Sequence, residues 1–239
     1  MRATIVGRAC RRLNVYRRAR FIVTSFESSS EQMEHVTPIV LIANKASAIS
    51  HCAFRTFASA LSREGYSGFV LERSHVLGAS CVDDAVSRLH EAIHEAGIMP
   101  PILIASNFTA YLAQKYLESY PLKGLIMLDP PSPCIAEDCT QLRSNENSIL
   151  CQSILLSDER SRIVNLEKGC VPMMLVSTSD RRSTARAVVS LHGIAEEDVM
   201  LIDRSELHHT ENIANNIDSA LLADHRVHCA LLRWIDLWG

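Results

Sequence analysis

The side chains best suited to chemistry follow apolar runs of the sequence. A serine hydroxyl, an imidazole and a carboxylate are the groups that nucleophilic catalysis combines. Ser106 and Asn107 follow residues 102–105, Asp180 follows residues 173–176, and His208 and His209 follow residues 199–202. A histidine pair in a loop is more often solvated than catalytic, and Asp180 could instead be a turn residue or the ion-pair partner of Arg181 or Arg182.

Metal and cofactor chemistry has little support in the sequence. The eight cysteines form no C-x-x-C pair, which leaves free buried thiols as the expectation: Cys10, Cys52, Cys81, Cys134, Cys139, Cys151, Cys170 and Cys229. His225 and His228 lack a third nearby ligand and are interpreted as a solvated helix face. Since neither G-x-G-x-x-G after the first strand nor a G-K-[ST] loop is present, we expect no metal, dinucleotide or nucleotide cofactor.

Short apolar runs alternate with helical periodicity from residue 36 onward. Strands are expected at 38–43, 68–71, 102–105, 125–128, 173–176 and 199–202. The helices between them are marked by sets such as Phe54, Phe57, Ala58 and Leu61, or Val82, Val86, Leu89 and Ile93, and end near Gly65 and Gly97. Fully apolar strands joined by helices predict an α/β fold, a three-layer α/β/α sandwich around a mostly parallel sheet.

A last helix carries a wide apolar stripe that must pack against the sheet: Val227, Ala230, Leu231, Trp234, Ile235 and Trp238. Residues 130–170 are irregular and polar, with one short helix expected at 149–156. At 239 residues, one domain over 36–239 is the expectation.

The first 20 residues differ in charge from the rest of the chain. They contain seven arginines and no acid, with interspersed apolar residues, which is typical of a mitochondrial transit peptide and indicates a mitochondrial location. The serine- and acid-rich stretch 24–34 is expected to be a linker, so residues 1–35 are interpreted as disordered leader and linker. Without the seven arginines, 17 basic residues face 27 acidic ones. This balance disfavours nucleic-acid binding, and no apolar run is long enough to span a membrane, so the protein is expected to be soluble.

One stretch, ILIASNFTAYLAQKYLESYPLKGLIMLDPPSP at 102–133, resembles the central segment of the α/β-hydrolase family: strand, nucleophile elbow, helix, strand. Active members read G-x-S-x-G there. Aligned by the helix, Ala105 takes the place of the first glycine, Asn107 that of the nucleophile, and Thr109 and Ala110 that of later glycines. Asparagine tolerates the positive φ of such a turn, but a carboxamide cannot be activated for attack.

A register shifted by one would make Ser106 the nucleophile. That alternative places Ile104 and Phe108 where the elbow requires very small residues, and it breaks the alignment of the helix.

The resemblance also assigns the remaining catalytic positions. The oxyanion loop would fall at Ala43 and Asn44, with the backbone of Phe108 as the second donor. The acid would fall near Asp180, one position early, with Arg181 in the aligned slot. His208 or His209 would be the base. Residues 134–170 take the place of a short lid.

Three functions remain open. The first is a catalytically inactive hydrolase-like protein (a pseudoenzyme) that binds partners or a small apolar ligand. The second is an active esterase or lipase-like hydrolase using Ser106, Thr109 or a cysteine. The third is a structural subunit of a large mitochondrial assembly.

Overall fold

The computed structural model describes residues 22–28, 35–43, 48–72, 82–97, 100–131, 164, 166–207 and 217–238. The expected helix at 149–156, nearly all of the lid-like segment 134–170, and the leader before residue 22 lie outside these ranges.

The described residues form one seven-stranded sheet. Its order is β1-β3-β2-β4-β5-β6-β7, and every neighbouring pair except β1–β3 is parallel. The strands are β1 Ile22–Phe26, β2 Ile39–Ala43, β3 Gly68–Glu72, β4 Ile102–Ser106, β5 Gly124–Leu128, β6 Met173–Thr178 and β7 Val199–Ile202. All six predicted strands are confirmed.

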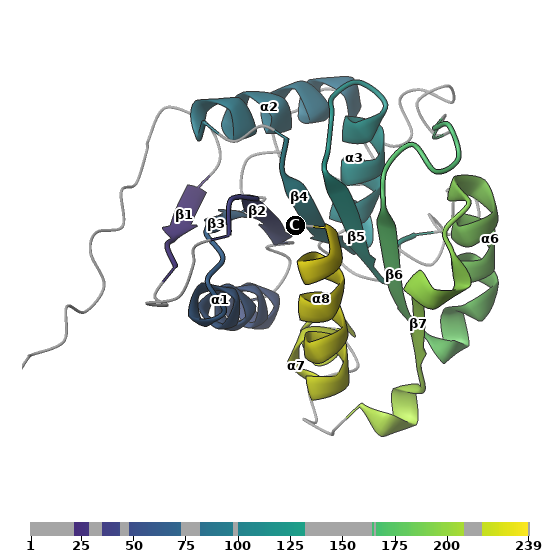
Figure 1. The fold of residues 1–239 in the computed structure, drawn as a ribbon. Helices are drawn as coiled ribbons and strands as arrows, with labels where there is room; N and C mark the ends of the chain where they lie inside the picture. Colours follow the sequence, from purple (N-terminus) through teal and green to yellow (C-terminus); the bar gives the residue numbers. More distant parts are fainter. Residues whose placement is uncertain are drawn as a thin grey trace, which may run out of the picture.

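Helices cover both faces of this sheet (Figure 1). One face carries α2 Val82–Glu95, α3 Asn107–Leu117 and α6 Arg182–His192. The other carries α1 Ala48–Arg63, α7 Ile217–Ala223 and α8 His225–Trp238. Short 3-10 turns occupy Ser179–Arg181, Glu196–Asp198 and Arg204–Glu206. The predicted three-layer α/β/α architecture is therefore confirmed.

Two hydrophobic cores lie on opposite faces of the sheet. Strand residues alternate between them, as in β4, where Leu103 and Ala105 belong to one core and Ile102 and Ile104 to the other. Because both faces are covered, all five residues of β4 are buried. The continuous apolar runs of the sequence have this physical origin.

Strand β1 corrects the expected boundary of the folded domain. Residues 22–26 pair antiparallel with β3 at the edge of the sheet, so the stretch interpreted as leader and linker contributes a strand. Its polar sequence, TSFES over 24–28, hid the strand because an edge strand can face solvent.

Other differences concern single side chains. Trp238 is 45% exposed although it continues the apolar stripe of α8, because it lies on the last turn, beyond the part of the helix that the sheet covers. The free cysteines of the described residues, Cys52, Cys170 and Cys229, are exposed rather than buried. Among the described helices, none combines the length and hydrophobicity needed to cross a membrane.

Candidate functional site

The carboxyl ends of β4, β5 and β6 lie side by side and bring together polar residues from distant parts of the chain. Ser106 pairs with Leu128, and Leu128 pairs with Val176. The next residues along these strands, Asn107, Asp129 and Ser177, therefore follow one another across the edge of the sheet, about 5 Å apart per strand. Ligands of parallel α/β sheets generally bind at this edge.

Asn107 forms the turn between β4 and α3. Its φ is 50°, in the left-handed region, and it is the first residue of α3. The positive φ predicted for this asparagine is confirmed. Its side chain is partly exposed, so the carboxamide is the polar group that this turn presents near the surface.

Ser106 and Thr109 lie beneath the turn and are completely buried. The Thr109 hydroxyl accepts a hydrogen bond from the Ser106 backbone N–H at 3.0 Å. It also lies 2.7 Å from the Ser106 carbonyl and 3.1 Å from the Ile42 carbonyl, to either of which it can donate. Thr109 thus links the turn to the end of β2. This side chain occupies a position where the expected motif has glycine.

Asp129 is the second non-glycine residue with positive φ among those described, at 47°. Its side chain is 1% exposed and both carboxylate oxygens are engaged. The Ser177 hydroxyl donates to Oδ1 at 2.8 Å, and Arg181 donates to Oδ2 at 2.8 Å and to the Asp129 carbonyl at 3.2 Å. Two strained residues at the ends of neighbouring strands are a common feature of functional sites.

The expected acid position is therefore occupied by a cation. Arg181 forms a largely buried ion pair with Asp129, whereas Asp180 is exposed and pairs with Arg204 at 3.4 Å. The alternative that Asp180 pairs with Arg181 or Arg182 is wrong, because Arg181 turns toward the carboxylate at the end of β5. The Thr178 hydroxyl, followed by the charge of Arg204, lowers the pKa of Asp180.

The remaining expected residues are less completely described. His208, His209 and Asn44 lie outside the described residues. The backbones of Ala43 and Phe108 are the last residue of β2 and the second residue of α3. The structure thus leaves the contacts of the proposed base and oxyanion loop as predictions.

Solved structures resemble the chain over nearly its full length. An α/β-hydrolase enzyme from a lagoon-sediment metagenome superposes with a TM-score of 0.60 and 15% identity, over 90% of this chain and 95% of that one. Mouse alpha/beta hydrolase domain-containing protein 10 gives 0.58 and 14%, over 92% and 96%. This chain has the α/β-hydrolase fold. A proline iminopeptidase-related protein from Thermus thermophilus, at 0.58 and 11% over 95% and 96%, agrees.

Comparisons of sequence add nothing to this result, since no family model and no curated protein matches the chain. At such low identity, the structural likeness concerns the fold alone. Within the α/β-hydrolase fold, the turn between β4 and α3 is the nucleophile elbow.

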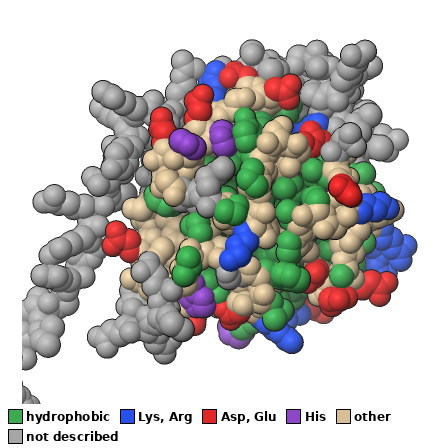
Figure 2. Space-filling view, turned by 45° about the horizontal axis from the view of Figure 1, so that its top comes forward, with side chains coloured by type: hydrophobic (Ala, Val, Ile, Leu, Met, Phe, Trp, Pro, Cys, Tyr) green, Lys and Arg blue, Asp and Glu red, His purple; other side chains and the backbone are tan. Residues whose placement is uncertain are grey.

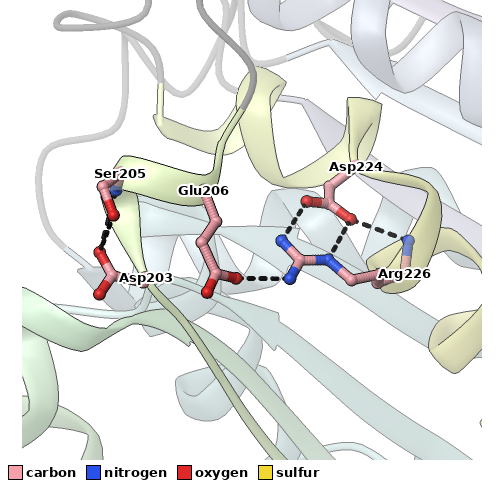
Figure 3. A network of polar contacts seen from close by, with 5 residues as sticks. All are labelled: Asp203, Ser205, Glu206, Asp224 and Arg226. Atoms are coloured by element: carbon pink, nitrogen blue, oxygen red, sulfur yellow. Dashed lines mark hydrogen bonds and ion pairs between the residues drawn. The ribbon is translucent and has the colours of Figure 1, made fainter.

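A surface network lies beside the segment that carries the two histidines (Figure 3). Arg226 donates through two nitrogens to Asp224, and its third contact, with Glu206, is 2.5 Å long. Hydrogen bonds from Arg226 lower the pKa of Asp224. Because Glu206 precedes His208 by two residues, this network ties α8 to the start of that segment.

A groove lies at the opposite, amino edge of the sheet. It encloses about 520 Å³ between the segments 117–122 and 166–171, and its lining mixes Leu117, Tyr120 and Val171 with Glu118 and Glu167. Hydrophobic and polar side chains alternate in a similar way over the face shown in Figure 2. The groove is remote from the elbow and has no charged or polar pattern specific for one ligand.

Sequence reasoning missed Asp129 and Ser177. The signal was present, because Asp129 follows a buried strand at the same register as Asn107 and precedes two prolines. The assembled site offers a carboxamide, a neutralised carboxylate and a partly exposed guanidinium. Such groups can bind a ligand by hydrogen bonds. Among the described residues, no three His, Cys, Asp or Glu side chains are grouped to hold a metal ion.

Proposed function

We propose that this chain is a mitochondrial α/β-hydrolase-like protein without hydrolase activity. It acts by binding, either as a subunit of a protein complex or as a receptor for a small apolar ligand. The observation that carries the proposal is Asn107, which has φ 50° at the elbow where an active member would hold serine.

Two neighbouring hydroxyl groups are poor substitutes for the missing nucleophile. Ser106 and Thr109 are completely buried, and the Thr109 hydroxyl is engaged with backbone groups of β2 and β4. A nucleophile must reach both its substrate and its general base. Loss of the nucleophile alone costs a serine protease about a millionfold in turnover, or about 8 kcal/mol.

The ion pair at the acid position adds support from a different residue. In an active site, a carboxylate orients the histidine and stabilises its protonated form. Arg181 in that slot would repel an imidazolium, and the nearby Asp129 is already neutralised by Arg181 and Ser177. The two substitutions together favour a binding role.

Labelling with a fluorophosphonate tests the absence of catalysis. The purified protein should incorporate no stoichiometric label, and hydrolysis of p-nitrophenyl acetate should equal the buffer blank. Stoichiometric labelling would refute the proposal. In that event, comparison of Ser106→Ala with Thr109→Val would identify which hydroxyl reacts.

The location and the complex need separate measurements. A fluorescent protein fused after residue 35 should enter mitochondria, and replacing the seven leader arginines by glutamine should abolish entry. In an organelle lysate, the tagged protein should sediment well above its 26.6 kDa mass if it is a complex subunit. Sedimentation as a monomer would leave the small-ligand receptor as the binding role.

A further inference from the structure

A histidine and a cysteine meet on the outer surface of α8, away from the elbow. His225 and Cys229 are one helical turn apart, and both are exposed. The Cys229 sulfur lies 3.5 Å from Nε2 and 3.6 Å from Nδ1 of His225. The expectation of a solvated histidine pair is wrong for His228, whose partly buried ring packs edge-on against Phe57 at 5.0 Å.

The separation of the two side chains suits a shared metal ion. Zinc binds histidine nitrogen at about 2.0–2.1 Å and thiolate sulfur at about 2.3 Å, usually in tetrahedral geometry. These lengths and a tetrahedral angle place the nitrogen and sulfur about 3.6 Å apart. The observed contact therefore requires little movement to accommodate the ion.

The first turn of α8 is held in place by the network of Figure 3. The Asp224 carboxylate accepts a hydrogen bond from the Arg226 backbone N–H at 2.8 Å and binds the Arg226 guanidinium as well. The guanidinium is further neutralised by Glu206. These contacts fix the backbone on both sides of His225 and reduce the repulsion between Arg226 and a nearby cation.

Comparable side chains elsewhere in the described residues are less suited to a metal. His90 and His94 also stand one turn apart, but the His90 ring stacks on Tyr120 at 3.7 Å and its Nδ1 lies 3.3 Å from the Tyr116 hydroxyl. The exposed Cys52 and Cys170 have no histidine contact among the described residues.

We propose that His225 and Cys229 form a zinc-binding site. On binding, the Cys229 thiol loses its proton to solvent, its sulfur and one His225 nitrogen bond the ion, and two coordination positions remain for water. This site does not depend on the proposed function of the elbow.

Alkylation of the full-length, reduced protein tests the site. Iodoacetamide modifies each exposed thiol, and mass spectrometry gives a rate for each cysteine. Zinc ions should slow the alkylation of Cys229 on the order of tenfold, as expected when about nine tenths of the thiolate is metal-bound, while Cys52 and Cys170 react at unchanged rates. Equal slowing at all three cysteines, or no slowing at Cys229, would overturn the proposal.

A histidine variant separates the pair from the cysteine alone. His225→Ala should remove the zinc protection of Cys229, whereas the matched change His94→Ala should leave it intact. Because His225 begins α8, thermal unfolding of each variant must first match that of the wild type; His225→Asn serves if the alanine variant is unstable. Full protection of Cys229 in a folded His225 variant would refute the shared site.

Discussion

Acidification should destabilise the packing of α6 against α3, because a neutral histidine is buried between them. His192 is 1% exposed, and its Nε2 lies 2.8 Å from Oε1 of Gln114, which is itself buried. The Gln114 amide nitrogen donates to the Ala110 carbonyl, so Oε1 faces the imidazole as an acceptor. The His192 proton therefore resides on Nε2, and the buried Nδ1 has no partner among the described residues.

Protonation of this Nδ1 would place a charge in the core. Burial lowers the pKa of His192 from 6.5 to about 4 in the folded protein. Between these values the unfolded chain binds more protons than the folded one, so stability falls as the pH decreases through 6.5 and the loss is complete below about 4. From about pH 7.5 to about pH 5, the two pKa values give a loss of about 2 kcal/mol.

Urea unfolding at the two pH values measures this loss. Other groups also titrate over the range, so the informative quantity is the difference between wild type and His192→Gln in their change of unfolding free energy. The wild type should lose about 2 kcal/mol more than the variant. An exposed-histidine control, His94→Gln, should behave as the wild type does. If His192→Gln shows the same pH dependence as the wild type, the buried neutral imidazole is not the cause.

Three further perturbations test the site. Arg181→Leu should lower the unfolding free energy by about 3 kcal/mol because it leaves the Asp129 carboxylate buried and unpaired, whereas Arg204→Leu, at an exposed pair, should change it by less than about 0.5 kcal/mol in urea unfolding. Asn107→Gly should retain stability and Asn107→Val should lose about 1–2 kcal/mol, since only glycine adopts the left-handed turn without strain; equal melting temperatures would contradict this. Thr109→Val should cost about 1–3 kcal/mol in chemical denaturation by leaving the Ser106 N–H unpaired, and Thr109→Ser should recover most of the loss.

The sequence predicted those parts of the fold that depend on local pattern. Continuous apolar runs identified the parallel strands because both faces of the sheet are buried. Asn107 was predicted to have positive φ from its residue type alone. The edge strand β1 escaped prediction because its stability comes from pairing with β3, more than 40 residues away in the sequence.

The ion pair of the site depends on an equally distant contact. Arg181 and Asp129 are 52 residues apart, and nothing in the pattern around Asp180 distinguishes which of three nearby charged residues turns inward. The register of β5 beside β6 decides this, because it places Asp129 next to Ser177. Prediction of such a pair therefore requires the strand order as well as the strands themselves.

The energetic cost of this edge of the sheet favours a role for it. Asn107 and Asp129 both adopt the left-handed region, at a cost of about 1 kcal/mol each, and a buried ion pair is often less stabilising than apolar packing of the same volume. A fold that needed only stability could replace these residues with glycine and hydrophobic side chains. Strained polar residues are accounted for if the carboxyl edge binds a ligand or partner that uses their fixed orientation. Thr109 fits the same interpretation, because its hydroxyl stabilises the turn without offering a nucleophile.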